Sequence, residues 1–133
     1  MDFLLNLHQF EDLGLLILRV AIGTIFLVHG ASKWSMWKQP QGTPPNMMTN
    51  IMRLLSIVEP VAGIAVFLGV FTQVAAIGLA LVMIGAIYMK SMKWQKSFTG
   101  DGGWELDFMI LAGCITLLFL GAGGYSFDNL WGL

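Results

Sequence analysis

Four long apolar segments limit what this chain of 133 residues can fold into. They cover residues 13–30, 51–71, 72–89 and 105–121. Each has roughly 17–21 residues, which as a helix measure about 25–31 Å, close to the hydrocarbon thickness of a bilayer. Only helices and closed barrels span lipid, and these continuous runs lack the alternation of barrel strands. The segments therefore predict an all-α fold, an integral membrane four-helix bundle, with residues 1–133 forming a single transmembrane domain.

The composition indicates that lipid surrounds the chain. Hydrophobic residues make up 56% and charged residues only 11% of the sequence, whereas a soluble domain carries about a quarter charged residues. A chain this short cannot bury so much apolar surface in a water-facing core. The net charge of −1 gives no field that would attract nucleic acid. We therefore expect the bilayer as a partner, and no nucleic acid.

The connections between the segments predict how they pair. The second and third segments nearly touch, so residues 69–73 predict a tight turn between antiparallel neighbours. The loop over residues 31–50 is longer, and the loop over residues 90–103 is polar. Gly78 and Gly85 share a face of the third segment, and small residues on one face let helix backbones approach closely.

The basic residues predict the orientation in the membrane. Six of them fall on one side of the four-span arrangement: Lys33, Lys38, Arg53, Lys90, Lys93 and Lys96. The positive-inside rule places that side in the cytoplasm and both termini outside. Four tryptophans cluster on the same side and predict an interfacial belt: Trp34, Trp37, Trp94 and Trp104. The first twelve residues contain no Lys or Arg, so we expect no cleaved signal peptide and a retained first span.

Ionisable residues at membrane depth or at its edge are the candidate site residues: Arg19, His29, Glu59, Glu105 and Asp107. Such residues are costly in lipid and usually face a bundle interior or a wet cavity. Arg19 and Glu59 lie about 16 and 12 Å below the basic side, so we hypothesise an ion pair between them. The pair would either lock two helices or hold a polar group of a ligand. Pro60 frees the carbonyl of Ser56, which the Arg19 guanidinium or the Ser56 hydroxyl would satisfy.

The other three candidates lie near the basic side. His29, Glu105 and Asp107 would line one mouth of the bundle, where a carboxylate beside the histidine makes a proton relay conceivable. Alternatively, His29 bonds a loop carbonyl, and the two acids simply favour the positive end of the fourth helix. Glu105 and Asp107 are about 200° apart around a helix, so only one of them should face the bundle centre.

No residue pattern indicates catalysis or a metal. The single cysteine, Cys114, excludes an intramolecular disulfide and a CxxC motif, and we expect it to be a small buried hydrophobe. The two histidines, His8 and His29, fall on opposite sides of the membrane and cannot share a metal or haem. We expect no catalytic residue, no metal and no cofactor bound by this chain alone.

Several short motifs, taken in order, resemble the DoxX-like family of small bacterial membrane proteins over almost the whole chain. They are residues 18–23 (LRVAIG), His29-Gly30 with Lys33, Glu59 with Gly63, Leu68-Gly69 with Thr72, residues 102–105 (GGWE) and residues 121–128 (GAGGYSFD). The chain departs from the family pattern at Gln73, where many members carry a basic residue, and at Ala122 and Gly124 in the last motif.

This resemblance implies a four-helix bundle in the bacterial cytoplasmic (inner) membrane. The family is linked by name to a membrane subunit of a thiosulfate:quinone oxidoreductase. The resemblance therefore implies an accessory or anchor subunit of a redox complex, not catalytic alone, with other membrane subunits as partners. A quinone is the ligand such a subunit would contact, and Arg19, His29 and Glu59 in an apolar bundle would supply its hydrogen-bonding groups. Two alternatives stay open: a purely structural subunit that fills an interface of a larger assembly, and a small transporter or ligand-binding bundle.

Overall fold

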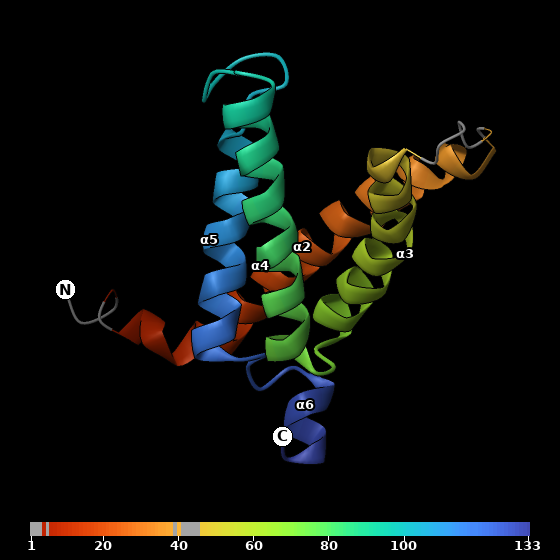
Figure 1. The fold of residues 1–133 in the computed structure, drawn as a ribbon. Coiled ribbons are helices and arrows are strands. Elements are labelled where there is room, and N and C mark those ends of the chain that lie inside the picture. The colour runs from red at the N-terminus through yellow and green to blue at the C-terminus, as the bar shows by residue number, and fades with distance from the viewer. Residues whose placement is uncertain (1–3, 5, 39, 41–45) are drawn as a thin grey trace.

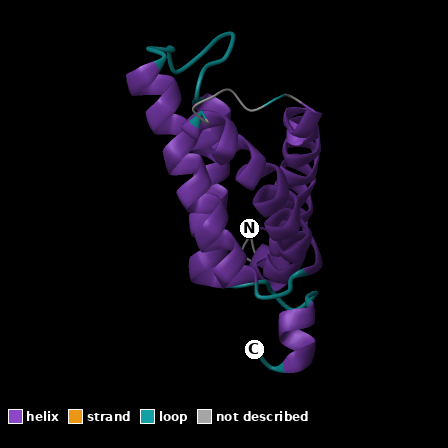
Figure 2. Cartoon of the chain, turned by 45° about the vertical axis from the view of Figure 1, so that its right-hand side comes forward, coloured by secondary structure: helices purple, strands orange, loops and turns teal. Residues whose placement is uncertain are grey.

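A computed structural model describes residue 4, residues 6–38, residue 40 and residues 46–133. Within these residues all regular structure is helical (Figure 2), which confirms the all-α fold. The four long helices are α2 (Glu11–Ser32), α3 (Met47–Leu68), α4 (Thr72–Tyr88) and α5 (Glu105–Leu120). The short ones are η1 (Asn6–Phe10), η2 (Lys33–Lys38), η3 (Met89–Lys93) and α6 (Phe127–Trp131).

Three helical segments of the described chain are long and apolar enough to cross a membrane: Asn6–Lys38, Met47–Leu68 and Thr72–Lys93. Large apolar side chains also project from the outside of the molecule, such as Val74 (70% exposed) and Phe119 (78% exposed). Lipid is the medium that covers such a surface. The fourth predicted span coincides with α5, whose 16 residues measure about 24 Å. Its crossing of the bilayer stays a prediction.

Local signals explain where α3 begins and ends. The Asn46 side chain accepts a hydrogen bond of 3.0 Å from the Met48 amide and caps the start of the helix. Gly69 ends it in the left-handed conformation with φ of 73°, which confirms the predicted tight turn into α4. The predicted 31–50 loop is shorter than expected, because helix continues through Lys38 and α3 starts at Met47. Residues 41–45 of that loop lie outside the described residues.

The long helices form two pairs. α2 packs mainly against α3, and α4 mainly against α5. The pairs come together near the turn after α3 and diverge toward the other end of the molecule (Figure 1). Where all four helices meet, they bury one apolar cluster: Ile22, Phe26, Val66, Ala76, Leu79, Met83, Ile110, Cys114 and Leu117. Cys114 is fully buried, as a small hydrophobe should be.

Glycines bring α2 and α3 into close contact. A Cβ at Gly23 would lie 2.7 Å from the Phe67 Cβ, and one at Gly30 would lie 2.3 Å from the Pro60 ring. These two positions therefore need a residue without a side chain. The prediction of close helix packing at Gly78 and Gly85 is wrong, because a Cβ at either position would meet no atom within 4 Å.

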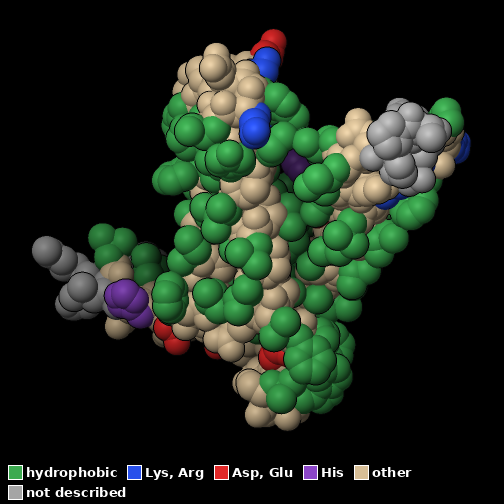
Figure 3. Space-filling model, in the orientation of Figure 1, with side chains coloured by type: hydrophobic (Ala, Val, Ile, Leu, Met, Phe, Trp, Pro, Cys, Tyr) green, Lys and Arg blue, Asp and Glu red, His purple; other side chains and the backbone are tan. Residues whose placement is uncertain are grey.

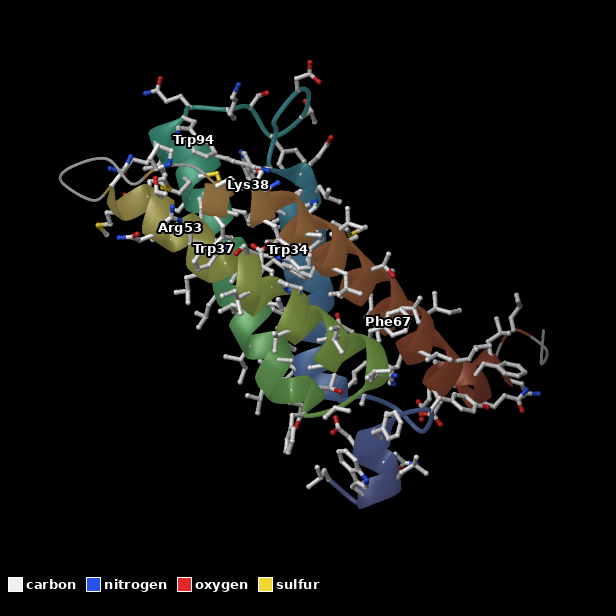
Figure 4. All side chains as sticks on the ribbon, turned by 90° about the vertical axis from the view of Figure 1, so that its right-hand side faces the viewer. Trp34, Trp37, Lys38, Arg53, Phe67 and Trp94 are labelled. Carbon is white, nitrogen blue, oxygen red and sulfur yellow. The ribbon has the colours of Figure 1, made fainter. Side chains whose placement is uncertain are left out.

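The two ends of the molecule differ in charge. The six cations named above belong to the segments at one end, which we call the basic end, and the Lys and Arg side chains visible in Figure 3 gather there. Figure 4 shows Trp34, Trp37, Arg53 and Trp94 at the same end. The opposite end, here the turn end, carries the α3–α4 turn (residues 69–71), the loop over residues 121–126, and α6 (Figure 1).

Candidate functional site: a cavity at the basic end

A cavity of about 640 Å³ lies between the two helix pairs at the basic end. We call it the central cavity. Most of its wall is apolar and includes four methionines, Met48, Met52, Met83 and Met89. Its charged or titratable lining residues are His29, Lys33, Glu59, Tyr88, Lys90 and Asp107. A largely apolar wall with a few polar groups is the usual form of a small-molecule site.

The first polar feature of the cavity is an ion pair between η2 and α3. The Lys33 Nζ lies 2.5 Å from both carboxylate oxygens of Glu59. The Glu59 side chain is only 2% exposed, whereas that of Lys33 is 24% exposed. Because Glu59 pairs with Lys33, the ion pair predicted between Glu59 and Arg19 is wrong.

The second polar feature is an ion pair between η3 and α5. The Lys90 Nζ lies 2.6 Å from the Asp107 Oδ2. Lys90 belongs to a single π-helical turn, a local widening that recurs at functional sites. Asp107 is buried and Glu105 is exposed, which confirms that only one of these acids faces the bundle interior.

His29 completes the polar part of the wall. Its side chain is half-buried on α2 and lines the central cavity. Among the residues that the structure describes, none forms a hydrogen bond with its imidazole, so the predicted bond to a loop carbonyl is not found there. The ring nitrogens of His29 therefore stay available to a ligand.

Two indoles hold η2 against α3 beside the cavity. Pro60 leaves the Ser56 carbonyl without its helical donor, and the Trp34 Nε1 donates to that carbonyl at 3.0 Å. The Trp37 Nε1 donates to the Ser56 Oγ at 2.9 Å, and that hydroxyl donates in turn to the Arg53 carbonyl. The predicted donors to the Ser56 carbonyl, the Arg19 guanidinium and the Ser56 hydroxyl, are therefore wrong.

Arg19 lies at the turn end, away from the cavity. Its Nε and Nη2 donate to the carbonyls of Val66 and Phe67, at 3.1 and 3.2 Å, where α3 ends. Its Nη1 donates to the carbonyls of Ala122 and Tyr125, at 2.6 and 2.9 Å, in the loop after α5. The side chain is 1% exposed. Arg19 is thus a structural clamp between three segments.

Two aspartates reinforce the same end. The Asp128 carboxylate accepts from the backbone amides of Phe71 and Thr72, at 2.6 and 2.9 Å, and caps the start of α4. The Asp12 carboxylate accepts from the Gly124 amide at 2.6 Å. The departure from the family pattern at Gly124 therefore falls on a position whose backbone holds α2.

Three of the five predicted site residues, His29, Glu59 and Asp107, line the central cavity. The sequence analysis did not group these three together, and it missed the lysine partners of the two acids. In the sequence, Lys33 and Lys90 stand out only as basic residues on one side of the membrane and, for Lys33, as part of the motif with His29. One signal was present, because Lys33 follows His29 by four residues and so shares its helical face. For Lys90, only the position of α5 beside η3 reveals the partner.

The fold defines an integral membrane protein of packed helices, and the central cavity at its basic end is large enough for a small ligand. The chain belongs to the DoxX family, whose sequence profile matches residues 14–92.

Three relatives match most of the chain. One from Bacillus subtilis, named "Putative oxidoreductase CatD", is 31% identical over 88% of this chain and 86% of its own length. An uncharacterized membrane protein of Mycobacterium tuberculosis is 30% identical over 92% of this chain and 84% of its own length. An uncharacterized protein of Haemophilus influenzae is 27% identical, over 93% and 95%. No solved structure gives a significant match.

Proposed function

We propose that this chain is an accessory or anchor subunit of a redox complex and that its central cavity contacts a quinone. The observation that carries the proposal is the cavity itself, an apolar space of about 640 Å³ with His29 and two ion pairs on its wall. A quinone needs an apolar slot and a few hydrogen-bonding groups at its carbonyl oxygens. The name of the Bacillus subtilis relative supports a redox setting.

The ion pairs suit this ligand in a second way. An ammonium has three N–H donors, and Lys33 and Lys90 remain about a quarter exposed beside their carboxylates. Each lysine can therefore donate to a ligand oxygen without losing its partner. In this function Lys33, Lys90 and His29 bind the quinone head group, whereas Arg19 and Glu105 take no part.

We place the protein in the bacterial cytoplasmic membrane with the basic end inside and both termini outside. The support is the collection of six cations at one end, which the positive-inside rule assigns to the cytoplasm. Reporter fusions test the orientation. Alkaline phosphatase joined after Leu133 should be active, and a fluorescent protein joined there should be dark. The reverse result would invert the topology.

A cavity-filling substitution tests the binding proposal. Gly85 lines the cavity and a Cβ there meets no atom within 4 Å, so the side chain of Gly85→Leu starts in open space at the cavity wall and takes up part of the cavity. Gly78 shares its face of α4, has equally open space and does not line the cavity, so Gly78→Leu is the matched control. We expect Gly85→Leu to weaken saturable binding of decylubiquinone about tenfold or more, and Gly78→Leu to leave it unchanged.

The two named alternatives give different results. Native protein that shows no saturable decylubiquinone binding contradicts the quinone proposal. If the protein copurifies with redox subunits and Gly85→Leu leaves their activity intact, the structural alternative is favoured. A pure homo-oligomer that carries out solute flux in liposomes would favour the transport alternative.

A further inference from the structure

The central cavity opens sideways, where α3 and α4 diverge. Ile51 on α3 and Leu81 on α4 both line the cavity, yet they are 38% and 64% exposed on the outside of the molecule. Ile51 lies near the start of α3 at the basic end and Leu81 lies near the middle of α4, so the two residues mark this opening at different depths. Figure 3 shows the surface hollowed between the two helices. Leu81 precedes Lys90 by nine residues, which is about 13 Å along a helix. The opening therefore extends from the basic end into the hydrocarbon depth.

The wall beside the opening suits a flexible apolar chain. The four methionines named above line the cavity, and their unbranched side chains adapt to irregular apolar shapes. Gly85 stands between them on α4 with open space where a side chain would be. Glycine in a helix lowers stability by about 0.5–1 kcal/mol relative to alanine. At Gly85 the absence of a side chain leaves room in the cavity.

The charged side chains at the polar end of the cavity have a net charge of zero. The two cations, Lys33 and Lys90, are each paired with one buried carboxylate, that of Glu59 or Asp107. An anionic head group would compete with those carboxylates, and a cationic one with the lysines, and either would carry a charge into a largely apolar space. An uncharged head group that carries oxygen acceptors has neither cost. It needs only the lysine N–H groups that are not bonded to the carboxylates.

We propose that the central cavity takes up an uncharged, long-tailed amphiphile from the bilayer, through the opening between Ile51 and Leu81. The head lies between the two ion pairs, and the tail leaves between α3 and α4 into the lipid. This inference rests on the cavity being a ligand site, as in the proposed function, and not on the ligand being a quinone. It assigns the membrane as the source of the ligand.

Photolabelling in lipid nanodiscs tests the route and the ligand class. The probe is a sixteen-carbon alcohol with a diazirine in its chain, compared with the fatty acid of equal length and diazirine position. Labelled residues are mapped by mass spectrometry. We expect the alcohol to label residues 51–55 and 81–86 saturably, and the fatty acid to label them at least about fivefold less.

Substitutions at the opening separate it from the rest of the lipid-facing surface. Leu81→Trp narrows the opening and should reduce saturable labelling of residues 51–55 about fivefold or more. Ile84→Trp is the matched control, because Ile84 is 52% exposed on the same helix and does not line the cavity. If Leu81→Trp does not fold, Ile51→Trp is the substitute, because it narrows the opening from α3.

The possible results are distinct. Saturable labelling that decylubiquinone displaces supports both the inference and the quinone proposal. Saturable labelling that decylubiquinone does not displace supports the inference and contradicts the quinone. The inference is overturned by labelling that does not saturate, by equal or stronger labelling with the fatty acid, or by equal effects of Leu81→Trp and Ile84→Trp.

Discussion

The Arg19 clamp makes a quantitative prediction. Its guanidinium donates four hydrogen bonds to backbone carbonyls of the α3 end and the loop after α5. A hydrogen bond from a charged donor contributes about 1.5–3 kcal/mol, and two of the four, at 3.1 and 3.2 Å, are long. We therefore expect Arg19→Met to lower the free energy of unfolding by about 3–5 kcal/mol, because breaking a buried hydrogen-bond network is among the most destabilising effects of a single substitution.

A lysine at the same position should rescue only part of this loss. The guanidinium reaches the two groups of carbonyls with separate nitrogens, whereas an ammonium is a single point that reaches one group. We expect Arg19→Lys to cost about half as much as Arg19→Met. Because Arg19 lies outside the central cavity, the folded Arg19→Lys protein should bind decylubiquinone like the native chain.

The assay is unfolding by sodium dodecyl sulfate in mixed micelles, followed by circular dichroism. Lys38→Met is the control, because Lys38 is exposed and a surface substitution should stay within about 0.5 kcal/mol of the native chain. If Arg19→Met also stays within that range, the clamp does not stabilise the fold and the reasoning is refuted. If Arg19→Lys folds but loses ligand binding, Arg19 belongs to the binding site after all.

Two further predictions use the same assay. Lys33→Met should cost about 3–5 kcal/mol, because it leaves the buried Glu59 carboxylate unpaired. Glu59→Gln removes the carboxylate and should cost about 1–2 kcal/mol; equal costs would contradict the Lys33–Glu59 ion pair. Gly30→Ala should cost about 1–3 kcal/mol because its Cβ would lie 2.3 Å from a proline ring on α3. Gly14→Ala, in open space on the same helix, should instead gain about 0.5–1 kcal/mol. A Gly30→Ala variant at least as stable as the native chain would contradict the α2–α3 packing.

The lengths of the apolar segments predicted the helices well. They could not predict how far α3 is shifted along the axis of α2. Aligning the ends of the apolar runs puts residue 30 opposite residue 51, and Arg19 then falls level with Glu59. In the structure Gly30 packs against Pro60, a shift of nine residues or about 13 Å. The apolar ends mislead because α3 starts four residues earlier and η2 continues beyond α2.

The glycines carried the information that the apolar ends lacked. A contact between two helix backbones depends on where a side chain is absent, so Gly23 and Gly30 determine the level of α3 on α2. Gly78 and Gly85 look identical in the sequence and yet face open space. Sequence spacing finds the faces that carry small residues, but only the packed structure distinguishes a helix contact from a cavity wall.

The contacts that stabilise the fold and the proposed ligand cavity lie at opposite ends of this molecule. At the turn end, hydrogen bonds of Arg19, Asp12 and Asp128 join α2, α3, α4 and the segments after α5. At the basic end each described ion pair stays within one helix pair, Lys33 with Glu59 and Lys90 with Asp107. The two pairs are therefore held together where the cavity is absent and are left apart where it opens. Regions with fewer stabilising contacts open at lower free energy, so a ligand that enters between α3 and α4 can widen the basic end without breaking the contacts that maintain the fold.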